Sequence, residues 1–263
     1  MTPPEILFER CARVAHVKLN RPDTLNAITL SMIDRLEAIL DEIENDTTLC
    51  AVIVAGSARA FSAGADLKDL AEDDRGISAS GEGSFPARLT NVLRRLERCP
   101  VPVIAAVRGW ALAGGLEIVL CCDLVIAGQS AKFGDAHAKY GLLPSGGSSV
   151  RLPRRVGTMR AREMMFTGDW FTAAAMRDGG LVSRVVGDDE VDAEASRLAD
   201  RLASRSPVGL RRMKSLLLRN AELGIGEGLA AEQLEWGSHA ASKDMREGLA
   251  AFREKRTPRF TGH

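Results

Sequence analysis

Short runs of apolar residues alternate with amphipathic segments along the first two thirds of the chain. The runs at 51–56, 103–107 and 124–128 are five or six residues long, as expected of strands that are buried on both faces. The segment 29–46 has its apolar residues on one helical face and most of its acidic residues on the other, which indicates an amphipathic helix. This alternation predicts an α/β fold in which helices connect neighbouring strands.

The other signals in this part of the chain add a hairpin, two helices and a polar segment. Residues 6–22 contain two short strands and end in a turn at Asn-Arg-Pro. Residues 88–99 predict a helix that the following prolines end, and 115–123 predict a short helix that begins at paired glycines. Residues 72–87 are polar and rich in glycine and serine, which is typical of an exposed loop.

Helical patterns dominate the rest of the chain, because strand signals become sparse after about residue 158. No sequence repeat of fixed period is evident. The sequence therefore predicts an α/β part followed by an all-helical part. The predicted helical segments are 191–206, 209–220, 227–240 and 242–256.

Charge and cysteine content narrow the function classes. The chain has 35 basic and 35 acidic residues and no net charge, which argues against nucleic acids and membrane surfaces as partners, since both select positive proteins. No apolar run reaches the length of a membrane span, and the N-terminus lacks the pattern of a signal peptide. The five cysteines form no CxxC pair, which predicts reduced thiols and neither a disulfide framework nor a metal site. We expect a soluble, cytoplasmic protein.

Two segments share one design, in which a strand leads through small residues into the start of a helix. We call their turns the first glycine turn (residues 63–66, in FSAGADLKDL) and the second glycine turn (residues 113–116, in GWALAGGLEI). Helix starts expose unpaired N–H groups, and glycine lets a ligand approach them closely. Two such turns facing one point would form an oxyanion hole, a pair of donors for a developing negative oxygen. The alternative is two ordinary strand-to-helix connections, and the sequence leaves both open.

Glu117 directly follows the second glycine turn and precedes a run of apolar residues. A carboxylate buried in such surroundings is costly, and its pKa rises toward neutrality. A carboxyl group of that kind suits general acid–base catalysis. The alternative is an exposed acid in the first turn of a helix, where the helix dipole favours negative charge.

Six segments together, in this order and spacing, make the chain resemble the enoyl-CoA hydratase/isomerase family, the crotonase superfamily. The likeness runs from about residue 5 to the C-terminus. The segments are RPDTLNAI (21–28), FSAGADLKDL (61–70), IAAVRGWALAGGLEI (104–118), CCDLVIAG…AKFGDAHAKYGLLPSGGSSVRLPRRVG (121–157), FTGDWFTAAAMRDGGLVSRVV (166–186) and SKDMREGLAAFREKRTPRF (242–260).

The resemblance implies a fold, a substrate and an assembly. The fold is a spiral of ββα units over residues 1–195, followed by a helical trimerisation region over residues 196–263. The substrate is an acyl-CoA thioester, whose CoA is part of the substrate, and no metal or further cofactor is implied. The assembly is a homotrimer or a dimer of trimers.

The resemblance also places functional groups on this chain. The two oxyanion donors fall at the backbone N–H groups of Ala65 and Gly114, and the first catalytic acid falls at Glu117. We expect Trp110 to pack beside the second glycine turn or to touch the acyl chain, and residues 72–87 to form the wall or the lid of the acyl pocket. The residues that correspond to CoA-binding positions are Thr24, Leu25, Ala63, Asp66, Leu67 and Lys68.

The chain departs from the family pattern at the second catalytic acid. Family hydratases carry a second glutamate twenty residues after the first, and here that position is His137. Histidine exchanges protons near neutral pH, and Asp135 would orient it if the two lie on one face of a strand. The alternative is a loop histidine that is hydrogen-bonded to a carbonyl group.

This departure leaves several reactions open. The first is hydration of a 2-enoyl-CoA, with Glu117 activating water and His137 assisting. The second is double-bond isomerisation, or hydrolysis of a thioester or C–C bond by an Asp135–His137 pair. The third, which the retention of Glu117 argues against, is a non-catalytic acyl-CoA binder.

Overall fold

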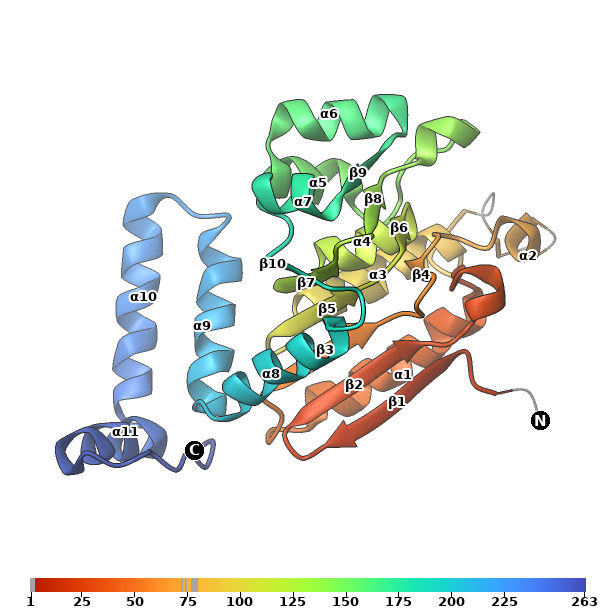
Figure 1. Ribbon diagram of the computed structural model, residues 1–263. Coiled ribbons are helices and arrows are strands. Elements are labelled where there is room, and N and C mark those ends of the chain that lie inside the picture. Colours follow the sequence, from red (N-terminus) through yellow and green to blue (C-terminus); the bar gives the residue numbers. More distant parts are fainter. Residues whose placement is uncertain (1–2, 72, 74, 77–79) are drawn as a thin grey trace.

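A six-stranded β-sheet is the centre of the fold (Figure 1). The computed structural model describes residues 3–71, 73, 75, 76 and 80–263. The strand order is β1-β2-β3-β5-β7-β10, with β1 antiparallel to β2 and every other neighbouring pair parallel. The strands are β1 (Ile6–Cys11), β2 (Val14–Leu19), β3 (Ala51–Ala55), β5 (Val103–Val107), β7 (Leu124–Gly128) and β10 (Arg184–Val186).

A second sheet of four short strands, ordered β4-β6-β8-β9, follows the first. Strands β4, β6 and β8 come shortly after β3, β5 and β7, so the chain passes from the larger sheet to the smaller one three times, and a helix follows each passage. This arrangement confirms the predicted spiral of ββα units. The strands are β4 (Ala60–Ser62), β6 (Trp110–Leu112), β8 (Lys132–Gly134) and β9 (Trp170–Thr172).

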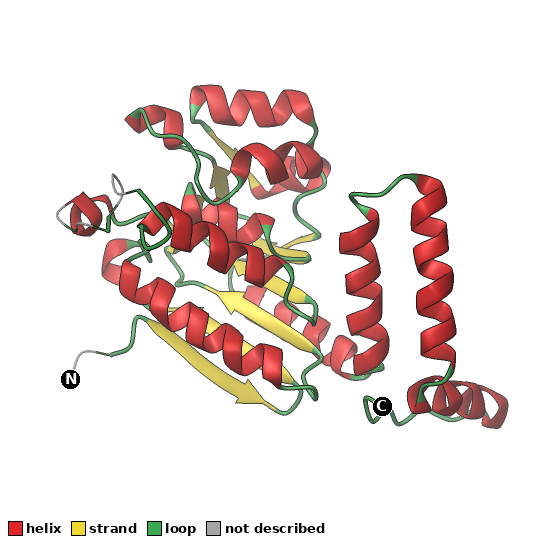
Figure 2. Ribbon diagram, turned by 180° about the vertical axis from the view of Figure 1, so that it is seen from behind, coloured by secondary structure: helices red, strands yellow, loops and turns green. Residues whose placement is uncertain are grey.

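Helices cover both faces of the larger sheet, which explains the apolar sequences of its central strands β3, β5 and β7. Helices α1 (Leu30–Asn45) and α3 (Phe85–Glu97) pack together over the face seen in Figure 2, and α8 (Val191–Ala203) covers the other face. Alternate residues of β3 enter different cores, with Val52 on the α1 side and Ile53 on the α8 side. The predicted amphipathic helix, hairpin and buried strands are confirmed.

The sequence misplaced the start of one helix and missed several short elements, among them two strands. Helix α3 begins at Phe85 and not at residue 88, because Ser84 caps it and Pro86 fits its first turn. Strands β9 and β10 have only three residues each, which is too short for a periodic signal. Of the predicted loop 72–87, residues 72, 74 and 77–79 lie outside the described residues.

Several shorter helices connect the strands. The 3-10 helix η1 (Pro22–Thr24) precedes the first glycine turn, and η2 (His137–Tyr140) follows β8. The α-helices are α2 (Leu67–Ala71), α4 (Gly114–Leu120), α5 (Ser148–Val156), α6 (Thr158–Thr167) and α7 (Ala173–Asp178).

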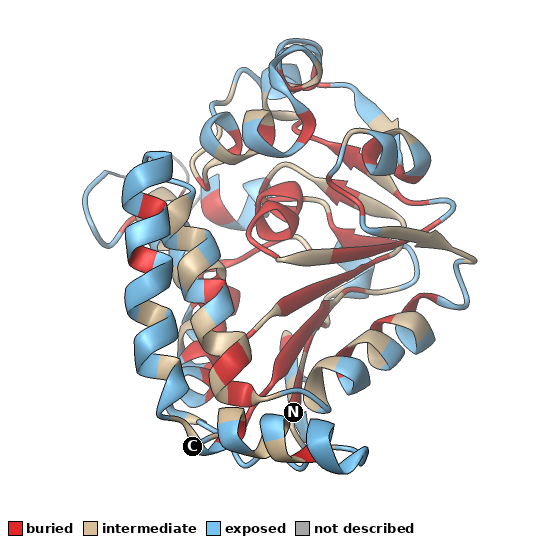
Figure 3. Cartoon of the chain, turned by 90° about the vertical axis from the view of Figure 1, so that its left-hand side faces the viewer, coloured by how far each residue is buried: buried red, intermediate tan, exposed pale blue. Residues whose placement is uncertain are grey.

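The last three helices, α9 (Pro207–Asn220), α10 (Ile225–Ala240) and α11 (Lys243–Glu254), lie beside the α/β core (Figure 1). Lys214 of α9 is buried and connects the two parts, because its Nζ lies 2.6 Å from Asp123 Oδ2 and 3.1 Å from the Val101 carbonyl. The predicted boundary at 195/196 falls inside α8, a helix that covers the sheet, and the division into two regions stays a prediction. Much of the outward surface of these helices is exposed (Figure 3).

In the part of the chain that the structure describes, no helix combines the length and the apolar character needed to cross a bilayer.

Candidate active site

Buried polar side chains shape the first glycine turn. Asn26 is fully buried, and its Nδ2 donates to the carbonyl groups of Ala60 (2.9 Å) and Phe61 (3.1 Å). Ser62 Oγ donates to the Asn26 carbonyl at 2.9 Å and accepts from Gly64 N–H at 3.2 Å. These bonds hold the turn against β4. Our sequence reasoning missed Asn26, although a polar residue between apolar ones in DTLNAI was a signal.

The second glycine turn is held in an unusual backbone conformation. Ala113 has φ +46°, a region that non-glycine residues seldom occupy, and its N–H donates to the Gly134 carbonyl at 3.0 Å. Helix α4 begins at the next residue, Gly114, whose N–H is therefore at the open end of the helix. An unfavourable backbone conformation of this kind persists only where the surrounding structure enforces it, and such positions are often found at functional sites.

The structure brings the two glycine turns into contact. A Cβ added to Gly64 would lie 2.9 Å from Ala113 Cβ and 3.4 Å from the Gly114 nitrogen. A Cβ added to Gly114 would lie 3.8 Å from the Ala65 nitrogen. The two backbones therefore lie side by side, and their N–H groups belong to one local site.

Glu117 is buried one helical turn beyond Gly114. Its side chain is 1% exposed, which excludes the alternative of an exposed first-turn acid. Oε1 accepts from the Ser148 N–H at 3.1 Å, and Oε2 has no hydrogen-bond partner among the described residues. Burial raises the pKa of Glu117, against the opposing effects of the Ser148 and Gly146 N–H groups and of the charge on His137. A buried carboxyl group whose pKa is raised in this way is suited to general acid–base catalysis.

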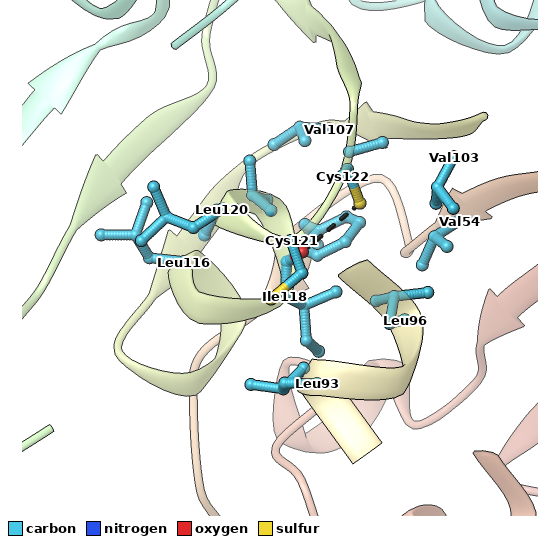
Figure 4. Packing of buried hydrophobic residues seen from close by; sticks show 14 of the residues in the cluster. Val54, Leu93, Leu96, Val103, Val107, Leu116, Ile118, Leu120, Cys121 and Cys122 are labelled. Carbon is cyan, nitrogen blue, oxygen red and sulfur yellow. Dashed lines mark hydrogen bonds between the residues drawn. The ribbon is translucent and has the colours of Figure 1, made fainter. Parts of the chain in front are cut away.

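Apolar packing fixes the helix that carries Glu117 (Figure 4). Leu116, Ile118 and Leu120 are buried around α4, and the thiol of Cys122 donates to the Ile118 carbonyl at 3.3 Å. Residues on α3, including Leu93, pack against the same helix (Figure 4). Because the interior is close-packed, the carboxyl group of Glu117 has a defined position.

An ion pair supports the loop on which Glu117 rests. Arg151 donates to both carboxylate oxygens of Glu97, at 2.9 and 2.7 Å, and to the Gly146 carbonyl at 2.7 Å. Bidentate Arg–carboxylate pairs have well-defined geometry, so this pair fixes the loop between η2 and α5. Sequence reasoning missed the pair, because its members are 54 residues apart.

Gly146 leaves the space that the Glu117 carboxyl group occupies. A Cβ at this position would lie 2.5 Å from Glu117 Oε2 and 2.7 Å from Leu93 Cδ1. We expect Gly146→Ala to displace the carboxyl group and to lower kcat at least about tenfold, since small misplacements of catalytic groups are costly. Steady-state kinetics measures the effect.

The control for this substitution is Gly237→Ala in α10, where an added Cβ meets no atom within 4 Å. It should leave kcat unchanged. Full activity of Gly146→Ala would contradict the placement of Glu117 against this loop.

His137 and Asp135 form a hydrogen-bonded pair. His137 Nδ1 lies 3.0 Å from Asp135 Oδ1, and both side chains are largely buried. The expectation that Asp135 orients His137 is confirmed, but the reason was wrong: β8 ends at Gly134, and Ala136, at φ +58°, turns the chain into η2. Burial alone would lower the pKa of His137, but the Asp135 hydrogen bond and the charges of Asp135 and Glu117 outweigh it and raise that pKa.

A cavity of about 510 Å³ joins these groups. Phe85 and Pro86 of α3 contribute to its wall, so the end of the predicted wall segment 72–87 does lie at the cavity. The predicted site residues that line the cavity are Leu25, Ala63, Ala65, Leu67, Trp110, Gly114, Glu117 and His137.

Three predicted CoA-binding residues do not line this cavity. Thr24 Oγ1 donates to the Arg21 carbonyl at 3.3 Å, and Asp66 forms an ion pair with Arg21 at 2.9 Å. Lys68 is exposed on α2. Any contact of these residues with CoA would therefore lie outside the cavity.

The ββα spiral and the converging glycine turns beside a buried glutamate define an enzyme of the crotonase class. The chain belongs to the enoyl-CoA hydratase/isomerase family, whose sequence model matches residues 9–263. It is 39% identical over 261 residues, 99% of both chains, to a probable enoyl-CoA hydratase of Mycobacterium bovis. It is 37% identical over 258 residues, 98% of this chain and 99% of the relative, to the 2,3-dehydroadipyl-CoA hydratase of Escherichia coli.

Solved structures agree with this assignment. The crystal structure of an enoyl-CoA hydratase from Bacillus anthracis superposes with a TM-score of 0.92 at 32% sequence identity, over 98% of this chain and 100% of that one.

Proposed function

We propose that the enzyme adds water to a 2-enoyl-CoA and forms a 3-hydroxyacyl-CoA. The observation that carries this proposal is the arrangement of one cavity, in which two convergent backbone turns, a buried Glu117 and an Asp-oriented His137 line the same space. Addition of water to a conjugated thioester needs these three elements: donors for an enolate oxygen, a base for water and an acid for C2.

In the proposed mechanism the thioester carbonyl oxygen accepts hydrogen bonds from the N–H groups of Ala65 and Gly114. Ionised Glu117 removes a proton from water as the water oxygen bonds to C3, and the π electrons move onto the carbonyl oxygen. Protonated His137 then donates its proton to C2, and the carbonyl group reforms. A proton passes from Glu117 back to His137 through solvent, which restores the starting state.

The two proton-transfer groups stabilise each other in the required forms. The charge on His137 favours ionised Glu117, and the charge on Glu117 favours protonated His137. The addition is redox-neutral and uses a protein base, so we propose no metal or cofactor beyond the CoA of the substrate. Leu25, Ala63 and Leu67 line the cavity at the first glycine turn, where we place the pantetheine arm.

The Asp135–His137 pair favours a second candidate, hydrolysis of the thioester. An Asp-oriented histidine can activate water for attack on a carbonyl carbon, and the same N–H groups would hold the tetrahedral oxyanion. Glu117 alone could support the third candidate, isomerisation, by moving a proton between C2 and C4.

One assay separates the three reactions. Purified protein is mixed with crotonyl-CoA, and the enoyl absorbance and free thiol are followed together. We expect absorbance to fall without release of thiol. Release of thiol identifies a hydrolase. An isomerase leaves the 2-enoyl thioester intact and converts a 3-enoyl-CoA into the conjugated 2-enoyl-CoA. Either result rejects hydration.

We further propose a homotrimer, or a dimer of trimers, assembled through the C-terminal helices. Apolar side chains with exposed surface on these helices support an interface. The free cysteines fit a reducing compartment, for which we propose the cytoplasm. The exposed large apolar residues of these helices are Met213, Leu217, Ile225, Leu229, Leu234, Trp236, Leu249 and Phe252.

A further inference from the structure

Two tryptophans form a corner at the wall of the catalytic cavity. The rings of Trp110 and Trp170 have centroids 5.8 Å apart and planes at 83°, an edge-to-face pair, and both residues line the cavity. Lys132 Nζ lies 4.3 Å from the centre of the Trp170 ring, a cation–π contact that holds the ring in place. The corner is thus an ordered surface of two perpendicular aromatic faces.

Strand register places this corner next to the catalytic groups. Trp110 of β6 is four residues before Gly114, on the strand that enters the second glycine turn. Trp170 of β9 pairs in register with Gly134 of β8, three residues before His137. A substrate whose carbonyl group lies at Gly114 and whose C3 lies between Glu117 and His137 therefore shares one cavity with this wall.

The wall around the corner is apolar. Leu112 lies on the same face of β6 as Trp110, and Phe85 and Leu89 of α3 line the same cavity. Lys139 also lines it, but its Nζ lies 3.5 Å from Asp169 Oδ1 and so already has a counter-ion. The surroundings suit a neutral substituent more than a carboxylate.

We propose that the substituent on C3 is an aromatic ring, so that the preferred substrates are 3-aryl-2-propenoyl-CoA thioesters. A flat ring in a perpendicular corner stacks on one indole and presents its edge to the other, a geometry that an alkyl chain cannot reproduce. Each such contact increases binding by about 2- to 10-fold beyond the effect of buried area. A planar conjugated acyl group also loses less conformational freedom on binding than an alkyl chain.

This inference rests on the proposed hydration, and its test compares two substrates with the same number of carbons on C3. They are cinnamoyl-CoA, with a phenyl group, and 2-nonenoyl-CoA, with a hexyl group. We expect kcat/KM for cinnamoyl-CoA to be at least about 4-fold higher, from two aromatic contacts of at least about 2-fold each. Trp170→Leu should reduce this ratio at least about 2-fold, and Trp170→Phe should keep most of it.

The matched control is Trp236→Leu, since Trp236 lies on α10, away from the cavity. It should leave the ratio unchanged even if it alters assembly. A native ratio near or below one, or a ratio that Trp170→Leu does not change, overturns the proposal.

Failure of hydration itself is distinguishable from failure of this inference. If crotonyl-CoA and both test substrates stay intact, the thermal stabilisation by 3-phenylpropanoyl-CoA and by nonanoyl-CoA is compared. If the phenyl compound gives the larger Tm increase, and Trp170→Leu removes this difference, the aromatic site is supported although the protein does not catalyse hydration. Equal increases overturn it.

Discussion

Glu117→Gln is expected to lower kcat for 2-enoyl-CoA hydration by about 10²- to 10⁴-fold, the range that general acid–base groups contribute. Glutamine has almost the same shape and can keep the bond from the Ser148 N–H to Oε1, so the cavity should stay intact. It cannot remove a proton from water. Steady-state kinetics measures the loss, and the Tm increase with a saturated acyl-CoA checks that binding remains.

The control for Glu117→Gln is Glu163→Gln on the exposed surface of α6, which should keep native kinetics. Activity of Glu117→Gln within about tenfold of the native enzyme would remove Glu117 from the mechanism. Loss of acyl-CoA binding together with activity would indicate a misfolded site instead.

Asp135→Asn is expected to move the alkaline limb of the kcat/KM profile to lower pH and to reduce the maximum about 10- to 100-fold. His137 acts as an acid and must be protonated, so activity is lost as pH rises through its pKa. Asp135 raises the pKa of His137, and removing its charge lowers that pKa. Rates measured from about pH 5 to pH 9 test the shift.

The acidic limb of the same profile reports Glu117, which must be ionised. Its pKa lies above the ordinary value because of burial, so activity should fall with decreasing pH at a higher pH than an exposed glutamate would give. His137→Ala should remove the alkaline limb, and Asp178→Asn on the surface should change neither limb. An alkaline limb that Asp135→Asn leaves in place would exclude His137 as the acid.

The elements that the sequence predicted are those whose burial is regular. Strand β3 places Val52 and Ile53 in cores on opposite faces of the sheet, so its sequence is continuously apolar. Helix α1 buries the apolar residues of one face, which gives the helical period. Strand β9 has three residues, and its two aromatic side chains, Trp170 and Phe171, are only partly buried. Its sequence therefore shows neither the alternation of a half-buried strand nor the continuous apolar run of a fully buried one. The start of α3 was hidden because Ser84, a cap, also fits a serine-rich loop.

Local chemistry in the site was predictable, and contacts across the chain were not. Glycines before a carboxylate indicated the second turn and Glu117, and the resemblance indicated His137. The N–H that holds the Glu117 carboxyl group comes from Ser148, 31 residues away, and only the folded chain brings it there. Periodicity and spacing report short-range order, so long-range hydrogen bonds of this kind leave no signal.

The pairing of β4 with β6 has a consequence for how this site can change. The pairing is parallel and shifts register between Ala60 and Ser62, and each strand leads directly into one glycine turn. The separation of the Ala65 and Gly114 N–H groups is therefore a property of main-chain pairing, and a slip of one residue would move one donor by about 3.3 Å. Side-chain substitutions outside the two turns leave this spacing in place. The proton-transfer groups Glu117 and His137, and Asp135, which orients His137, can each be changed by substitution of one residue. The chemistry performed on the thioester can thus diversify by point mutation while the enolate-binding frame is inherited unchanged.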